Sequence, residues 1–230
     1  FKSPNFKKNK NKIVLIGSKK LLQKQMLKLK YRFKIFEIDN VKEAKKKIIN
    51  IINVKYKFTK PFSKITKSSN QYIEECFNLA IKIIKLNKLT KLINGPISKI
   101  HFLKKKFPGI TEYIGFKTNT KELVMLICNH NLAVCPLTTH IPIKNVAKHI
   151  KKKRIINTIK KINNFYKSRL NKTPRIAILG LNPHCESIDK ISEEIKEIKP
   201  AIKFLNFNKI RVSGPFAADT FFLKKNIKKF

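Results

Sequence analysis

Two histidines of this chain follow apolar runs that are typical of strands. His140 lies in LTTHIPI (137–143), and His184 lies in GLNPHCE (180–186) after a Gly-Leu-Asn-Pro turn. Imidazole is a common ligand of divalent metals, although a single histidine is more often a structural residue than a ligand. Both histidines stand beside proline-containing turns at predicted strand ends, so they could converge on one ion, which usually needs a third protein ligand. We therefore treat both as candidate metal ligands.

Two other polar residues lie beside predicted turns. Thr111 follows the Pro-Gly turn of FPGITEYIG (107–115), where an ordinary surface turn is the simpler interpretation. Asp219 lies among small residues in GPFAADTFF (214–222) and is one of only three aspartates in a chain with 53 lysines and arginines. Its carboxylate fits a functional acid and the N-cap of a following helix equally well.

The elements that must position these residues alternate between strands and helices. Strands are predicted at 12–17, 33–38, 91–95 and 175–181, a hairpin at 122–138, and helices after Gly17, from an Asn70 N-cap, over 144–169 and from 191. This alternation implies an α/β fold with a mixed sheet. Open α/β sheets place their ligands at the carboxyl ends of strands, which is where the candidate residues lie.

Composition limits the class of protein. No apolar stretch approaches the roughly 20 residues that a membrane-spanning helix needs, and the basic first residues lead into no signal-peptide core. The four cysteines form no C-x-x-C pair, which favours reduced thiols and a cytoplasmic location. The chain begins with phenylalanine, so we expect processing or truncation.

The net charge of +40 raises the alternative of a basic protein that binds nucleic acid. However, only five of the 53 basic residues are arginine, the side chain that direct base readout favours, and lysine is spread through almost every segment. We therefore expect a solvated basic surface and no nucleic-acid partner.

Six motifs occur in order along the chain: NGPISK (94–99), FPGITEYIG (107–115), TTHIPI (138–143), PRIAILGLNPH (174–184), KPAI (199–202) and GPFAADTFF (214–222). Their order and approximate spacing resemble those of the 4-hydroxythreonine-4-phosphate dehydrogenase family of vitamin B6 biosynthesis. The resemblance implies an isocitrate/isopropylmalate dehydrogenase-like fold, with two α/β domains, an interdomain cleft and a homodimer whose active site lies at the subunit interface. We expect a partial first domain at 1–101 and a second domain at 102–230 that carries dimer and metal-site elements.

The resemblance also implies a reaction. The family uses NAD and a divalent metal, with zinc, cobalt or magnesium as candidates, to oxidise 4-phosphooxy-L-threonine, which then loses carbon dioxide to give 3-amino-2-oxopropyl phosphate. His140 and His184 match two of the three metal-binding histidines of the family. Thr111 matches a substrate-contacting threonine, and Asp219 matches an aspartate near the site that we take as a catalytic candidate.

Several departures from the family pattern bear on activity. Ile110 replaces a histidine before Thr111, which favours a phosphorylated threonate or erythronate as an alternative substrate. The family's glycine-rich segment after Asn-Pro-His becomes Cys-Glu-Ser-Ile (185–188), and its opening glycine-rich motif is absent. The third metal histidine and much of the NAD site would lie beyond Phe230. We expect the chain to bind metal and NAD weakly or not at all. A catalytically incomplete fragment and a non-catalytic basic binding protein stay alternatives.

Overall fold

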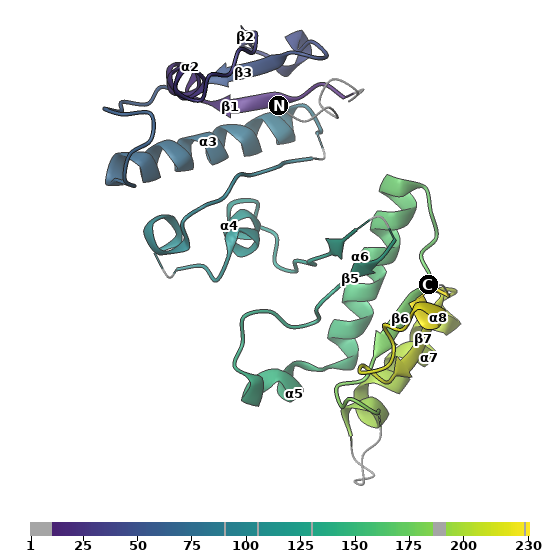
Figure 1. Cartoon of the computed structure of the whole chain (residues 1–230). Coiled ribbons are helices and arrows are strands. Elements are labelled where there is room, and N and C mark those ends of the chain that lie inside the picture. Colours follow the sequence, from purple (N-terminus) through teal and green to yellow (C-terminus); the bar gives the residue numbers. More distant parts are fainter. Residues whose placement is uncertain (1–10, 90, 105, 130, 186–191, 228) are drawn as a thin grey trace. The chain divides into compact units, whose positions relative to one another are not determined.

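The computed structural model describes the chain as two compact units, Phe1–Lys121 and Glu122–Phe230 (Figure 1). Within them it describes residues 11–89, 91–104, 106–129, 131–185, 192–227 and 229–230. The domain limit at residues 101 and 102 stays a prediction. Part of the segment 185–188, where the chain departs from the family pattern, lies outside the described residues.

A parallel three-stranded sheet organises the first unit. Its order is β1 (Val14–Gly17), β3 (Ile49–Asn53), β2 (Ile35–Glu37). The predicted strands at 12–17 and 33–38 are confirmed, but the central strand β3 was missed. Four of its five residues are buried, so β3 lacks the alternation of apolar and polar residues that marks a half-exposed strand.

Asn50 explains how a polar residue is tolerated inside β3. Its side chain is fully buried, its Oδ1 accepts from the Lys45 N–H at 2.8 Å, and its Nδ2 donates to the carbonyls of Ile13 at 2.9 Å and Lys45 at 2.8 Å. Because buried polar groups are costly unless paired, this amide ties the start of β1 and the loop before β3 to the strand itself.

Two helices follow the strands of this unit. α2 (Lys19–Lys28) begins at Ser18, whose side chain accepts from the Leu21 N–H. α3 (Lys67–Leu86) begins at Thr66, which forms a reciprocal capping box with Ser69. The predicted N-cap at Asn70 is therefore wrong, because a Thr-x-x-Ser box satisfies the first helical N–H groups one turn earlier.

The predicted strand at 91–95 is also wrong. These residues have no regular secondary structure, and Ile93 is 95% exposed, so no neighbouring strand covers them within the described part of the chain. The π-helical turn η2 (Lys99–Leu103) and the helix α4 (Ile110–Lys117) follow. They contribute Leu103 and Tyr113 to a buried cluster with Phe77 of α3.

The second unit begins with the predicted hairpin, which is short. β4 (Ile127–Cys128) pairs antiparallel with β5 (Ala133–Val134). The single helix predicted over 144–169 is instead a 3₁₀ turn η3 (Ile143–Asn145), α5 (Val146–His149) and α6 (Lys152–Leu170).

The helical prediction fails at Ile150, which has extended backbone (φ −81°, ψ 92°) and a buried side chain. The break lets Ile150 enter the core while the Lys152 N–H at the start of α6 donates to Glu197 Oε2 at 2.6 Å. Burial and a capping carboxylate thus outweigh the helical periodicity of the segment.

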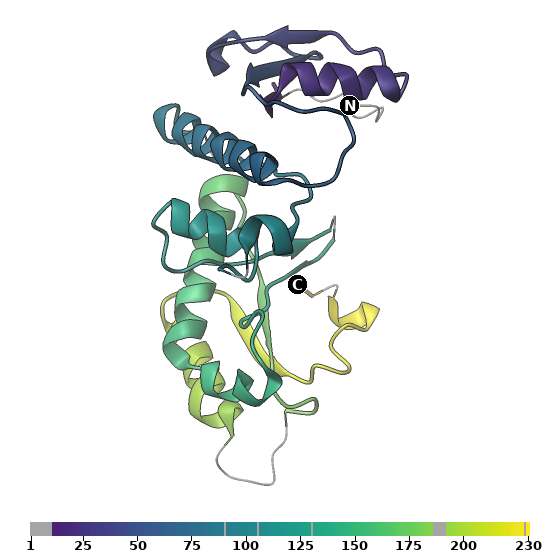
Figure 2. The same cartoon turned by 90° about the vertical axis from the view of Figure 1, so that its left-hand side faces the viewer.

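The core of this unit lies between two parallel strands and their helices. β6 (Ile176–Leu179) pairs with β7 (Val212–Phe216) through an irregular register, and the π-helical turn η4 (Glu194–Ile198) and α7 (Lys199–Phe207) connect them. α6 and α7 pack side by side (Figure 1, Figure 2), and a short helix, α8 (Lys224–Ile227), follows β7. The buried set is Ile150, Ile155, Ile159, Ile198, Ala201, Ile202, Leu205, Ile210 and Val212.

In the described residues, parallel and antiparallel strands occupy separate sheets, so the expected α/β class is present but one mixed sheet is not. None of the described helices is long and apolar enough to span a bilayer.

Candidate functional site

The parallel pairing of β6 and β7 brings His184 and Asp219 together. Beyond the strands, the Gly180 N–H donates to the Phe216 carbonyl at 2.9 Å, and the Ala218 N–H donates to the Pro183 carbonyl at 2.8 Å. These bonds keep the two outgoing segments in contact past their last ladder residues. At their ends, His184 Nδ1 lies 3.1 Å from Asp219 Oδ2.

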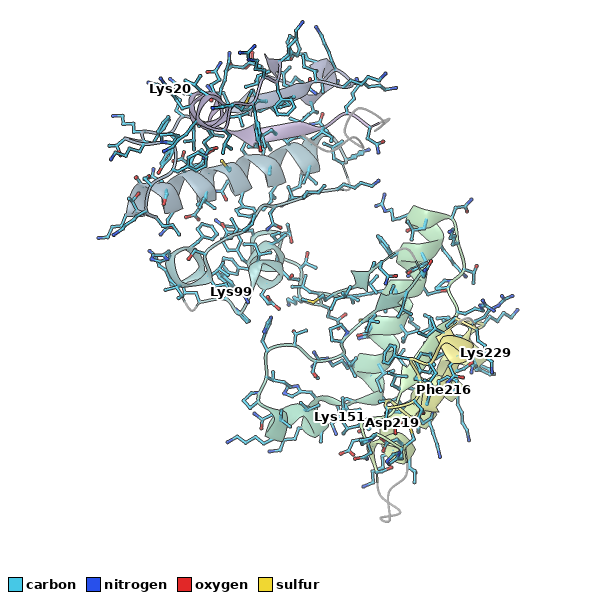
Figure 3. All side chains as sticks on the ribbon, viewed as in Figure 1. Lys20, Lys99, Lys151, Phe216, Asp219 and Lys229 are labelled. Atoms are coloured by element: carbon cyan, nitrogen blue, oxygen red, sulfur yellow. The ribbon has the colours of Figure 1, made fainter. Side chains whose placement is uncertain are left out.

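Asp219 therefore acts as the partner of a histidine and does not cap a helix. The helix α8 begins only at Lys224, after a turn, so Asp219 does not occupy its N-cap. Figure 3 labels Asp219 on the segment that follows Phe216, the last residue of β7. Of the two interpretations that the sequence left open, the helix cap is wrong, and a functional role for Asp219 stays a prediction.

The pair is open to solvent. The side chain of His184 is 75% exposed and that of Asp219 is 37% exposed. Exposed ion pairs contribute little to stability because water screens them, so this contact is better understood as orienting the ring than as stabilising the fold. With Nδ1 facing the carboxylate, Nε2 is the ring nitrogen left for a ligand, an arrangement common in metal-binding histidines.

The loop that carries His184 is held by a residue that sequence reasoning missed. Glu194 lies in the segment from residue 191, where the sequence predicts only the start of a helix. Its Oε1 in fact accepts from the backbone N–H groups of Leu181 and Asn182, at 2.8 and 2.9 Å, and the side chain is almost fully buried. Burial raises the pKa of this carboxyl, but the N–H donors outweigh burial, so the pKa lies below its ordinary value.

Gly180 lies where this loop leaves β6, at a tightly packed position. A Cβ at this position would collide with Cys185 Sγ and lie 3.1 Å from Glu194 Oε1. Cys185 itself has a positive φ of 58° and closes the turn by donating its N–H to the Asn182 carbonyl at 3.0 Å. Burial raises the pKa of the Cys185 thiol, which keeps it protonated near neutral pH.

His140 follows β5 in an exposed loop and has a positive φ of 56°. Within the described residues, no hydrogen bond or ion pair joins it to His184 or Asp219. The same residues contain no group of three histidines, cysteines or acids that could hold a metal ion. The convergence of His140 with His184 stays a prediction.

Thr111 lies in the first turn of α4, in the unit Phe1–Lys121. Its neighbours Glu112 and Tyr113 each bury a polar atom, Oε2 and the hydroxyl, that has no hydrogen-bond partner among the described residues. Burial also raises the pKa of Tyr113. These polar atoms make the start of α4 an unusual place in this unit, but nothing there identifies a ligand.

A cavity of about 850 Å³ lies beside β7 and does not include the histidine pair. Its lining contains Arg175, Arg211 and Lys229 together with an aromatic group formed by Phe216, Phe221 and Phe230. The basic side chains are exposed. The cavity therefore gives no reason to move the candidate site away from His184 and Asp219.

Comparison with known proteins identifies relatives of this chain. Residues 9–230 match a family model described as pyridoxal phosphate biosynthetic protein PdxA. A 4-hydroxythreonine-4-phosphate dehydrogenase of Sulfurihydrogenibium sp. (strain YO3AOP1) is 34% identical over 216 residues, which cover 91% of this chain and 66% of that protein. A protein of Fusobacterium nucleatum, provisionally named D-threonate 4-phosphate dehydrogenase, is 29% identical and covers 91% of this chain and 65% of its own length.

Solved structures of proteins with the same name have a similar fold. A 4-hydroxythreonine-4-phosphate dehydrogenase from Burkholderia phymatum superimposes with a TM-score of 0.80 at 26% identity, covering 94% of this chain and 68% of that one. The enzyme of the same name from Klebsiella pneumoniae gives a TM-score of 0.80 at 23% identity, with the same coverage, and supports the fold alone. The chain thus spans about two thirds of the length of the relatives that it matches.

Proposed function

The chain belongs to the family of the pyridoxal phosphate biosynthetic protein PdxA, and from this premise we propose that it serves the NAD-dependent oxidation and decarboxylation of 4-phosphooxy-L-threonine. The product would be 3-amino-2-oxopropyl phosphate. The observation that carries the proposal is the His184–Asp219 pair, 3.1 Å apart at the carboxyl ends of two parallel strands. The names of the curated relatives and the order of the six motifs support the same reaction class.

Two histidines, His184 and His140, could supply two of the ligands that a divalent metal needs. His184 has one ring nitrogen directed at a carboxylate and the other left for a cation, and its exposure would allow a metal to reach it. His184, together with His140, would hold the ion, with zinc, cobalt or magnesium as candidates. When bound, such an ion supplies Lewis-acid polarisation of the oxygen being oxidised.

The protein's own groups have separate roles in this proposal. The Asp219 carboxylate, 3.1 Å from His184 Nδ1, would accept a hydrogen bond from an Nδ1–H, select that ring tautomer and direct Nε2 toward the ion. Thr111 would contact the substrate through its hydroxyl. The isocitrate/isopropylmalate dehydrogenase-like cleft and the homodimer belong to the proposal, and size-exclusion chromatography with light scattering would test the second of these.

A second substrate deserves comparison in the same assay. Ile110 stands where the family pattern has a histidine, which removes a polar contact, and one relative is provisionally named a D-threonate 4-phosphate dehydrogenase. An aliphatic side chain tolerates a ligand that lacks the amino group of 4-phosphooxy-L-threonine. A threonate or erythronate phosphate is therefore the alternative substrate.

The test is NADH formation by the purified chain with each substrate, in the presence of zinc, cobalt or magnesium. Because weak binding of metal and NAD is expected, we expect at most slow turnover of 4-phosphooxy-L-threonine, and this turnover should need the metal and be abolished in His184→Ala. A higher kcat/KM for threonate 4-phosphate would replace the first substrate with the second. NADH formation that is unchanged in His184→Ala would overturn the assignment of the site.

A further inference from the structure

A buried carboxylate, Glu194, binds the backbone of the loop that carries His184. Glu194 is 1% exposed, and its Oε1 accepts from the Leu181 and Asn182 N–H groups at 2.8 and 2.9 Å. Its Oε2 accepts from Asn182 Nδ2 at 3.2 Å. In the described parts of the chain, no Lys, Arg or His nitrogen comes within 4.0 Å of this carboxylate. Uncharged donors, namely amides and the Ser192 hydroxyl, therefore compensate its burial.

This use of an acid is unusual for this chain. It has 13 acidic residues against 53 basic ones, so lysine partners are available almost everywhere. Glu37, Glu74, Glu122 and Glu197 each pair with a lysine at the surface. Glu194 instead lies inside, where two successive N–H groups converge on one of its oxygens.

The hydrogen bonds continue from Glu194 to the histidine. Asn182, which Glu194 holds, begins the turn that Cys185 closes with its N–H, and His184 lies within that turn. The Pro183 carbonyl accepts from Ala218, the residue before Asp219. The backbone of the loop is thus held at its start by Glu194 and at its middle by the segment that presents Asp219.

His184 depends on this backbone because packing gives it little support. Its side chain is 75% exposed, so the direction of the ring is set by the turn and by Asp219. A Cβ at Gly180 would collide with Cys185 Sγ and lie 3.1 Å from both the Asn182 carbonyl oxygen and Glu194 Oε1, so the loop packs closely against the carboxylate. Movement of Leu181 and Asn182 would therefore move the turn that carries the ring.

We propose that Glu194 is a positioning residue, whose carboxylate places His184 against Asp219 by holding the backbone at residues 181 and 182. The purpose of this placement rests on the proposed function, because an imidazole ring held in one orientation is useful for binding a ligand. The placement itself can be measured without metal, NAD or substrate. The two ideas can therefore fail separately.

The experiment is a double-mutant comparison by NMR on the full 230-residue chain. The ring ¹⁵N and ¹³Cε1 resonances of His184 are recorded with Asp219 intact and in Asp219→Asn, and their difference reports the contact. The difference is then measured again in the backgrounds Glu194→Ala, Glu194→Gln and Glu193→Gln. Glu193→Gln is the matched control, because it removes the same charge from the neighbouring residue, whose side chain caps nothing.

We expect Glu194→Ala to abolish most of the response of His184 to Asp219→Asn and to move the Leu181 and Asn182 amide protons upfield. Glu194→Gln should rescue part of the response, because an amide oxygen can still accept from both N–H groups, and Glu193→Gln should leave it intact. A folded Glu194→Ala chain with the full response would overturn the proposal. If Glu194→Ala does not fold, a full response in both Glu194→Gln and Gly180→Ala would overturn it as well.

Discussion

His184 Nδ1 lies 3.1 Å from Asp219 Oδ2, and the two residues come from loops that follow different strands. The contact is a product of the parallel β6·β7 pairing, whose last paired residues, Leu179 and Phe216, are 37 positions apart in the sequence.

 Thirty-four residues lie between His184 and Asp219 in the sequence. Neighbouring parallel strands end at the same edge of a sheet, which is why residues so distant in sequence meet there.

Removing the carboxylate of this pair should weaken metal binding without unfolding the chain. We expect Asp219→Asn to lower the affinity for Zn²⁺ by about 10- to 100-fold, because the ring of His184 loses the partner that orients it. The stability to urea should change by less than about 0.5 kcal/mol, since the pair is exposed. Calorimetric titration with Zn²⁺ measures the first effect and urea unfolding the second. An unchanged affinity would show that Asp219 does not support a metal site.

Gly180 and Gly95 provide a matched pair for testing the loop after β6. Gly180→Ala introduces a methyl group that collides with Cys185 Sγ, and we expect a loss of about 1–3 kcal/mol in the free energy of unfolding. Gly95→Ala meets no atom within 4 Å and should leave stability unchanged or raise it by up to about 1 kcal/mol. Urea unfolding of both variants checks the prediction. Equal effects at the two positions would contradict it.

Asn50 offers a test of the first unit. Asn50→Leu keeps a similar volume but leaves the Lys45 N–H and the carbonyls of Ile13 and Lys45 without their side-chain partner. Because unpaired buried polar groups cost about 1–3 kcal/mol each, we expect at least about 2 kcal/mol of destabilisation. Asn94→Leu, at an exposed position, is the control. Loss of amide protection in β1 and β3 by hydrogen exchange would locate the effect.

The lowered pKa of Glu194 predicts how the stability of the second unit depends on pH. A carboxyl whose pKa is lower in the folded state stabilises the fold above its unfolded pKa of about 4.3, and this contribution is lost as the pH falls through the folded pKa. Wild type should therefore be more stable than Glu194→Gln at pH 7, with the difference shrinking at acid pH. Urea unfolding from pH 7 to pH 3 measures it. A difference that is constant with pH would mean that the charge of Glu194 contributes nothing.

Several local features were predictable because short-range physics decides them. The strands at 12–17, 33–38 and 175–181 and the hairpin at 122–138 follow from apolar patterning and turn residues, and the structure confirms them. β3 was missed because burial on both faces removes the alternation that marks a strand. The strand at 91–95 was wrong because an apolar run by itself does not supply a pairing partner.

By itself, the sequence determined the α/β class, the family and the identity of His184 and Asp219 as candidate residues, because ordered motifs and local patterning are properties of the chain alone. Only the tertiary structure decided that Asp219 pairs with His184 and not with a helix terminus, and that Glu194 is a buried anchor of the loop. Both outcomes depend on which strands lie side by side and which carboxylate faces a backbone turn. Such contacts form between residues distant in sequence, so no local pattern records them.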